Sequence, residues 1–131
     1  MAAPSATVFE LLADPRKHAL FDGSGTVTGV SVAPARLALG ATFSMHMRMK
    51  LGYVTRNHVV VFEEGRAIAW HHAARFIWRY DLEAVDGGTD VTETFDYNRP
   101  WGFVIEWFGF PARNRAAMEA TLRRLEAVVT A

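Results

Sequence analysis

A glutamate on an otherwise apolar strand face is the first candidate for acid–base chemistry. Residues 89–98 alternate with a period of two, which places Glu93 on the same face as Val91 and Phe95. Burial among such neighbours raises the pKa of a carboxyl group, so that it can donate or accept a proton near neutral pH. A structural alternative stays open: in another register, or near the mouth of a cavity, Glu93 would pair with an arginine.

A histidine at a strand end is the second candidate. His72 follows His71, and adjacent strand residues point to opposite faces, so the two cannot share one metal ion as a helical i, i+4 pair does. The other histidines, at positions 18, 46 and 58, are scattered, and we expect no metal site. His72 is either a hydrogen-bond donor to a ligand or a partly exposed strand-end residue.

The sequence holds no signature of nucleophilic or cofactor chemistry. It has no cysteine and no G-x-S-x-G motif. The glycines at positions 23, 25, 87 and 88 are typical of turns, because no helix follows them as a dinucleotide-binding fingerprint requires. Glu93 and His72 are therefore the catalytic candidates, and we expect no cofactor.

The elements that position these residues follow from a change of period along the chain. Helical spacing is found in residues 4–13, in a short segment 15–21, and from Pro111 to the end, where Met118 begins an apolar stripe. Between them, marked turns separate strands with two-residue alternation. The predicted strands are Thr26–Val32, Ala41–Leu51, Tyr53–Phe62, Arg66–His72, Phe76–Val85 and Thr89–Asn98.

This order predicts one α+β domain, residues 1–131, in which a curved antiparallel sheet of about six strands wraps a long C-terminal helix. In the last hairpin, pairing Asp86 with Thr89 places Tyr80 opposite Phe95. The inward face is rich in aromatic residues and methionine, which is typical of a pocket wall, although a solid core is the alternative. The predicted ligand-binding residues are Phe43, Met45, Met47, Tyr53, Asn57, Trp70, His72, Trp78, Tyr80, Glu93, Phe95, Tyr97 and Met118, together with Trp101 and Trp107.

Trp101 and Trp107 lie in the aromatic segment 101–110. We interpret this segment as a lid or short helix over the mouth of the cavity. The alternative is a membrane-facing patch, but basic residues that would attract anionic lipids are not interleaved with the aromatic ones.

Composition excludes several classes of function. Lysine and arginine total 14, as do aspartate and glutamate, so the basic excess of a nucleic-acid-binding protein is missing. No signal peptide is visible, and no window approaches the ~20 apolar residues that a membrane-spanning helix needs. We therefore expect a cytoplasmic protein without stable membrane insertion.

Several segments resemble the START-like superfamily, also called SRPBCC, and most closely its polyketide cyclase/dehydrase-like branch. They are residues 8–15, 40–43, 57–70 and 88–95 and the final helix around 122–125. The resemblance spans nearly the whole chain and implies a helix-grip fold with a deep hydrophobic cavity. It transfers no catalytic residue, because the motifs that carry it belong to the fold.

One departure from the family pattern concerns the N-terminus. The family fold opens with a long strand, whereas here only three residues precede Pro4, fewer than the ~5–6 of a typical strand. Either the chain starts late or the sheet has one strand fewer. Open edges invite pairing with another chain, so we predict self-association as a homodimer or a distorted N-terminal edge.

The sequence thus leaves three functions open. The first is binding of a hydrophobic small molecule such as a lipid, a polyketide or an aromatic metabolite. The second is a cyclase/dehydrase-type enzyme that folds a substrate in the same cavity and moves protons with Glu93, His72 or a tyrosine. The third is a partner-binding module, which would expose a large apolar patch in place of an enclosed cavity.

Overall fold

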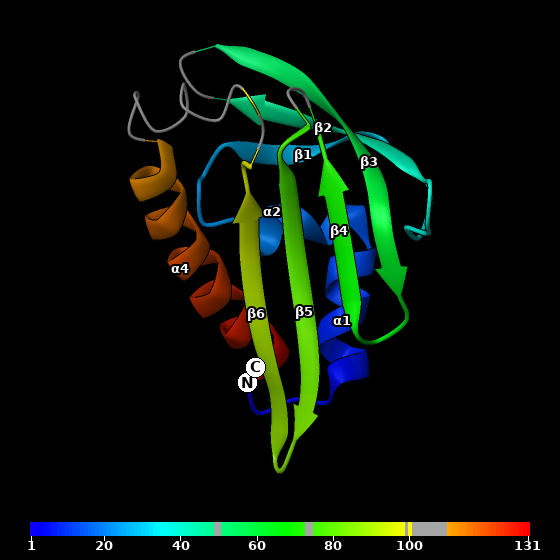
Figure 1. Cartoon of the computed structure of the whole chain (residues 1–131), viewed down its shortest axis with the longest axis vertical. Coiled ribbons are helices and arrows are strands. Elements are labelled where there is room, and N and C mark those ends of the chain that lie inside the picture. Colours follow the sequence, from blue (N-terminus) through cyan, green and yellow to red (C-terminus); the bar gives the residue numbers. More distant parts are fainter. Residues whose placement is uncertain (49–50, 73–74, 99, 101–109) are drawn as a thin grey trace.

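The computed structural model describes residues 1–48, 51–72, 75–98, 100 and 110–131, with the side chains at 110 and 111 left aside. The described chain begins with helix α1 (Ser5–Ala13), the short 3-10 helix η1 (Pro15–Lys17) and helix α2 (His18–Phe21). Six strands follow: β1 (Val27–Val32), β2 (Thr42–Arg48), β3 (Gly52–Glu63), β4 (Ala67–His71), β5 (Ile77–Val85) and β6 (Gly88–Asp96). Helix α4 (Phe110–Val129) is the last element of the chain (Figure 1). The predicted α+β fold class is confirmed.

The six strands form one antiparallel sheet in the order in which they occur in the chain. The β5–β6 hairpin turns at Asp86 and Gly87, with Val85 paired to Gly88. Tyr80 therefore lies opposite Glu93, and the predicted pairing of Tyr80 with Phe95 is wrong by two residues. An even shift leaves every side chain on the predicted face of the sheet.

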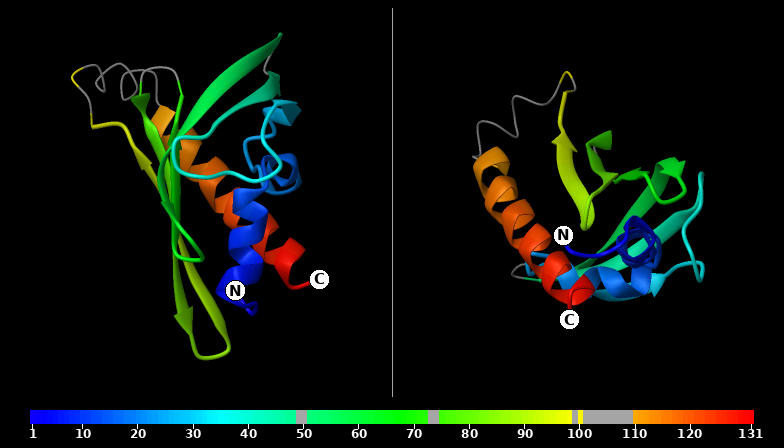
Figure 2. Two further views of the ribbon diagram at one scale, coloured as in Figure 1. Left: turned by 90° about the vertical axis from the view of Figure 1, so that its right-hand side faces the viewer. Right: turned by 90° about the horizontal axis from the view of Figure 1, so that it is seen from below.

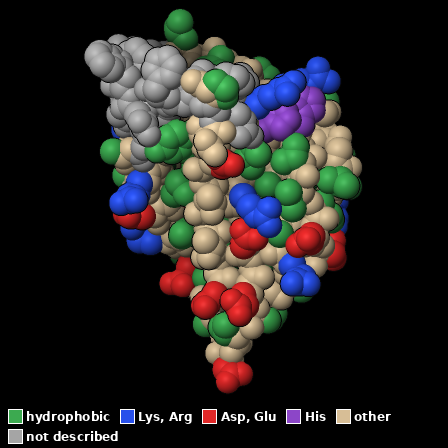
Figure 3. All heavy atoms as spheres, viewed as in Figure 1, with side chains coloured by type: hydrophobic (Ala, Val, Ile, Leu, Met, Phe, Trp, Pro, Cys, Tyr) green, Lys and Arg blue, Asp and Glu red, His purple; other side chains and the backbone are tan. Residues whose placement is uncertain are grey.

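The sheet curves around the helices. Viewed from the end, the strands form a trough and α4 crosses its open side (Figure 2). Helices α1 and α2 lie on the same concave side, where α1 contacts β5 and α2 contacts β1. The opposite face of the sheet is turned outward and carries charged side chains of both signs (Figure 3). This arrangement is the helix-grip architecture that the sequence predicted.

The buried core is concentrated where α1 meets the sheet and α4. Phe9, Leu12, Ile68 and Leu125 are all at most 1% exposed. Helix α1 ends at Ala13 because Asp14, which precedes Pro15, adopts an extended backbone. The chain then turns through η1 into α2, whose residues His18 and Phe21 are also buried.

The N-terminal residues contact the edge strand β6 at one position. The Thr89 amide donates to the Met1 carbonyl (2.8 Å), and the Thr89 hydroxyl donates to the Ala3 carbonyl (2.7 Å). Gly88 allows this approach, because a Cβ atom there would collide with the Met1 carbonyl. At the other edge, β1 pairs with β2 through two register irregularities. Self-association through either edge stays a prediction. Within the described part of the chain, no helix combines the length and apolar character needed to cross a bilayer.

Candidate functional site

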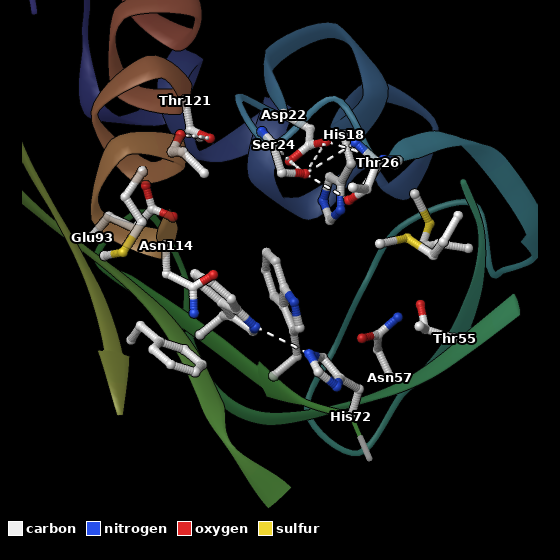
Figure 4. Close-up of a pocket in the computed structure, with 18 of the residues that line it drawn as sticks. His18, Asp22, Ser24, Thr26, Thr55, Asn57, His72, Glu93, Asn114 and Thr121 are labelled. Carbon is white, nitrogen blue, oxygen red and sulfur yellow. Dashed lines mark hydrogen bonds between the residues drawn. The ribbon is translucent and has the colours of Figure 1, made fainter. Parts of the chain in front are cut away.

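A pocket of about 500 Å³ lies between the concave face of the sheet, helix α4 and the segment that follows α2 (Figure 4). Its walls are mostly aromatic rings and methionines. Trp78 lies against Phe95 with ring centroids 4.3 Å apart, and Trp70 lies 5.7 Å from Tyr80. The predicted residues that line it are Phe43, Met45, Met47, Tyr53, Asn57, Trp70, His72, Trp78, Tyr80, Glu93, Phe95 and Met118.

Among the predicted residues that the structure describes, Tyr97 alone is missing from this lining. Tyr97 stacks on Phe95, with ring centroids 5.6 Å apart, and does not contribute to the wall. Trp101 and Trp107 lie outside the described residues, as does the rest of the predicted lid up to residue 109. That any of these side chains binds a ligand stays a prediction.

Glu93 reaches the pocket from β6. It is half-buried, and its Oε2 accepts a hydrogen bond from the Tyr80 hydroxyl at 3.0 Å. Its Oε1 is shielded from solvent and has no hydrogen-bond partner among the described residues. Burial raises the pKa of Glu93 to about 7; the Tyr80 hydrogen bond opposes the rise, and the negative charge of Asp22 adds to it. The carboxyl group can therefore exchange a proton near neutral pH.

Tyr80 is the partner that fixes this carboxyl. Its side chain is only 4% exposed and it sits directly opposite Glu93 in the β5–β6 ladder. Burial, together with the nearby Glu93 charge, raises the pKa of Tyr80 well above its usual range. The phenol therefore stays protonated and acts as a hydrogen-bond donor. Glu93 pairs with a tyrosine and not with the arginine that the sequence left open.

Asp22 provides a second acidic group, on the segment between α2 and β1. The Ser24 hydroxyl and the Val27 amide both donate to its carboxylate, at 2.7 and 3.1 Å. Ser24 in turn shares a hydrogen bond with Thr26 (2.7 Å), so this segment is internally bonded (Figure 4). These donors fix the orientation of the Asp22 carboxylate, whose negative charge acts on Glu93.

His18 forms part of the floor of the pocket. Its ring stacks on Trp70, with centroids 5.0 Å apart, and its Nε2 is 2.9 Å from the Leu12 carbonyl, to which it donates. Burial lowers the pKa of His18, so the imidazole is neutral in the folded protein. A neutral, hydrogen-bonded ring serves here as an aromatic surface and not as a proton carrier.

His72 lies at the opposite end of the pocket from His18. Its Nε2 accepts a hydrogen bond from the Trp78 indole at 3.2 Å. His71 points to the other face, where its ring lies 5.2 Å from that of His58. The described residues contain no group of three or more acidic or histidine side chains that could hold a metal ion.

Helix α4 supplies one wall of the pocket, of which the sequence analysis predicted only Met118. Asn114, Ala117 and Thr121 also line the pocket. Asn114 lies four residues before Met118 and Thr121 lies three after it, and this spacing is the signal that could have identified them. Thr121 is also a structural residue, because its hydroxyl accepts from the Gly23 amide at 2.8 Å.

Comparison with known proteins identifies the family. The model of the family described as "Polyketide cyclase / dehydrase and lipid transport" matches residues 1–130. The chain belongs to this family.

Two curated relatives come from Mycobacterium tuberculosis. The uncharacterized protein Rv0088 of strain H37Rv is 38% identical over 132 residues, which cover 95% of this chain and 59% of that protein. The uncharacterized protein MT0096 of strain CDC 1551 is 37% identical with the same coverage. The chain thus spans about three-fifths of the length of the curated relatives it matches.

Solved structures share the fold at low sequence identity. The AHSA1-like protein from Aeromonas hydrophila matches with a TM-score of 0.66 at 20% identity, covering 97% of this chain and 88% of that one. Protein NE0264 from Nitrosomonas europaea matches with a TM-score of 0.75 at 16% identity, covering 99% and 89%. The predicted START-like fold is confirmed, and these likenesses concern the fold alone.

Proposed function

We propose that this domain binds a hydrophobic small molecule, such as a lipid, a polyketide or an aromatic metabolite, in the pocket between the sheet and α4. The observation that carries the proposal is the composition of the wall. Trp70, Trp78 and Phe95 present ring surfaces, while Met45 and Met47 present flexible thioethers. Such side chains, with a few placed polar groups, are typical of small-molecule sites.

The size of the pocket supports this proposal. A volume of about 500 Å³ lies within the range of roughly 300–1,000 Å³ common for sites that hold drug-sized ligands. A partner-binding module would instead present its apolar surface outward. The described outward face of the sheet carries charged side chains among its hydrophobic ones (Figure 3), which favours the internal site.

One observation favours a second function, catalysis in the same pocket. Glu93 faces the site with a pKa of about 7, in hydrogen-bond contact with Tyr80. A carboxyl group that exchanges protons near neutral pH can act as a general acid or base on a bound polyketone. Confinement of such a substrate in a reactive conformation would supply a further part of the acceleration.

The proposal is tested by filling the pocket. Asn114 lines it from α4, whereas its neighbour Arg115 is exposed and lies outside the lining, so Asn114→Trp and Arg115→Trp form a matched pair. Titration with the neutral fluorescent probe N-phenyl-1-naphthylamine should give saturable binding to the wild-type chain and to Arg115→Trp. We expect Asn114→Trp to weaken binding at least ten-fold.

Two results would contradict the proposal. One is a wild-type chain that neither binds the probe nor carries a co-purified small molecule in native mass spectrometry. The other is equal binding by both tryptophan variants, which would place the probe outside the pocket.

A further inference from the structure

The polar atoms of the pocket are not equally available to a ligand. Asn57 uses its side-chain amide to donate to the Phe43 carbonyl (3.3 Å), and the Trp78 indole donates to His72. Asp22 is held by Ser24 and Val27. The Glu93 Oε1 atom differs, because it is a buried polar atom with no partner among the described residues. A buried group of this kind is costly unless something satisfies it.

The hydrogen bonds around Glu93 decide which role this oxygen can play. Because the Tyr80 hydroxyl donates to Oε2, the proton of the neutral carboxyl belongs on Oε1. Oε1 is then a donor that lacks an acceptor. Burial, and to a smaller extent the negative charge of Asp22, raises the pKa of Glu93 to about 7, so the neutral form predominates below that pH.

We propose that the ligand presents an oxygen acceptor, a ketone or an ether oxygen, to the Oε1 proton of Glu93. This inference rests on the proposed function, since it names the chemistry of the ligand that the same pocket would hold. Glu93 lines the pocket, and the terminal torsion of a glutamate is soft, so that its carboxyl group can turn toward a bound ligand. A carboxylate placed at this position fits poorly, because the negative charge of Asp22 acts on it there.

The polar and titratable residues around Glu93 come from each neighbouring element. Tyr80 faces it from β5, and Figure 4 shows Asn114 of α4 on the same side of the pocket. His18 of α2 and His72 after β4 lie elsewhere in the lining, and Arg113 of α4, although exposed to solvent, also lines the pocket. Asp22 is the group whose charge acts on Glu93 through space. A test must therefore separate Glu93 from these residues.

Three matched probes test the inference by calorimetric titration: 2-acetylnaphthalene, its hydrocarbon counterpart 2-ethylnaphthalene, and 2-naphthoate. At pH 6 we expect the ketone to bind about ten-fold more tightly than the hydrocarbon, as one added hydrogen bond to a buried group implies, and 2-naphthoate most weakly. Ionisation of Glu93 removes the donor. The preference for the ketone should therefore disappear by about pH 8.5, while hydrocarbon binding stays level.

Two variants assign the effect to Glu93. In Glu93→Gln the amide still donates to the ligand and still accepts from Tyr80, so the ketone preference should persist at every pH. In Glu93→Leu the preference should vanish while hydrocarbon binding is retained. Both variants leave His18, Asp22 and His72 in place, so a pH effect from those residues would survive in them.

The outcomes separate this inference from the proposed function. If the hydrocarbon binds and the ketone binds no better at pH 6, the inference is wrong and the pocket proposal stands. A ketone preference that grows with pH would also overturn it, because the ionised carboxylate has no proton to donate to the ketone. If neither neutral probe binds, both proposals fail. The wild-type pH profile decides the matter even if a variant folds poorly.

Discussion

The concave face of one sheet is packed solid beside α1 and hollow beside the N-terminal half of α4. In the solid half, Leu12 of α1 and Ile68 of β4 are fully buried, and Phe9 packs edge-on against Phe62 with centroids 5.3 Å apart. In the hollow half, Met47, Trp78 and Phe95 are only half-buried and face the pocket.

The two halves differ in residue type in a way that matches their packing. Branched aliphatic side chains fill a volume in few rotamers, which suits a permanent core. Flat rings and unbranched thioethers leave space and adapt to what enters it. Stability should therefore depend mainly on the α1 half, and ligand binding on the α4 half.

The largest loss of stability is expected from Phe9→Ala, in the solid half. Phe9 is 1% exposed and contacts Phe62, so its loss leaves a cavity that the solid half cannot close. We expect the free energy of unfolding, measured by urea denaturation, to fall by about 3–5 kcal/mol. The affinity of the folded variant for N-phenyl-1-naphthylamine should be unchanged. A large loss of affinity would show that the two halves are not independent.

A smaller change in stability is expected from the titration of Glu93 in the hollow half. Glu93 has a pKa of about 7 in the folded chain, against 4.5 as its ordinary value. Between these values the folded chain holds a proton that the unfolded chain has lost, so stability falls as pH rises across this window. The loss is about 3 kcal/mol at most.

Comparison with Glu93→Gln isolates this contribution. The variant cannot titrate at this position, so the stability of wild type relative to the variant should decline from pH 4.5 to 7 and then level off. His18 acts in the opposite sense: its lowered pKa makes stability fall as pH drops below its ordinary value of 6.5, equally in both proteins. A constant difference between wild type and variant would mean that Glu93 is not buried as described.

The smallest effect on stability is expected from Met47→Ala. Met47 borders existing space, so its removal enlarges the pocket without opening a new void. We expect a loss of about 1 kcal/mol, well below the 2–5 kcal/mol typical of a core Leu→Ala change such as Leu12→Ala. Probe affinity, in contrast, should fall several-fold for Met47→Ala only. Equal destabilisation by the two variants would remove the distinction between the halves.

The sequence predicted the strands well because alternation and turn residues are local signals. All six strands lie close to their predicted bounds, and the inward face was assigned correctly. The β5–β6 register failed by two residues because the segment 86–89 offers two adjacent sites for a two-residue turn. The Asp86-Gly87 pair forms it, with Gly87 at φ 82°, a left-handed conformation that glycine adopts readily. Gly88 serves instead the close approach of Met1.

The parts of the site that escaped sequence analysis depend on long-range contacts. Asp22 and His18 lie in a short helical segment whose period is too brief to show which side faces inward. Their position follows from α4, about 100 residues away in the chain, through the Gly23–Thr121 hydrogen bond. The Tyr80–Glu93 contact likewise required the true register of β5 and β6.

The contact between Gly23 and α4 also links two properties of the pocket. A Cβ atom at Gly23 would collide with the Ala117 carbonyl and the Thr121 amide, and Arg124 donates to the neighbouring Asp22 carbonyl. The helix that sets the width of the cavity thus holds the residue whose charge raises the proton affinity of Glu93. Through Gly23, the position of the helix that lines the pocket is thus tied to the position of the charge that acts on Glu93.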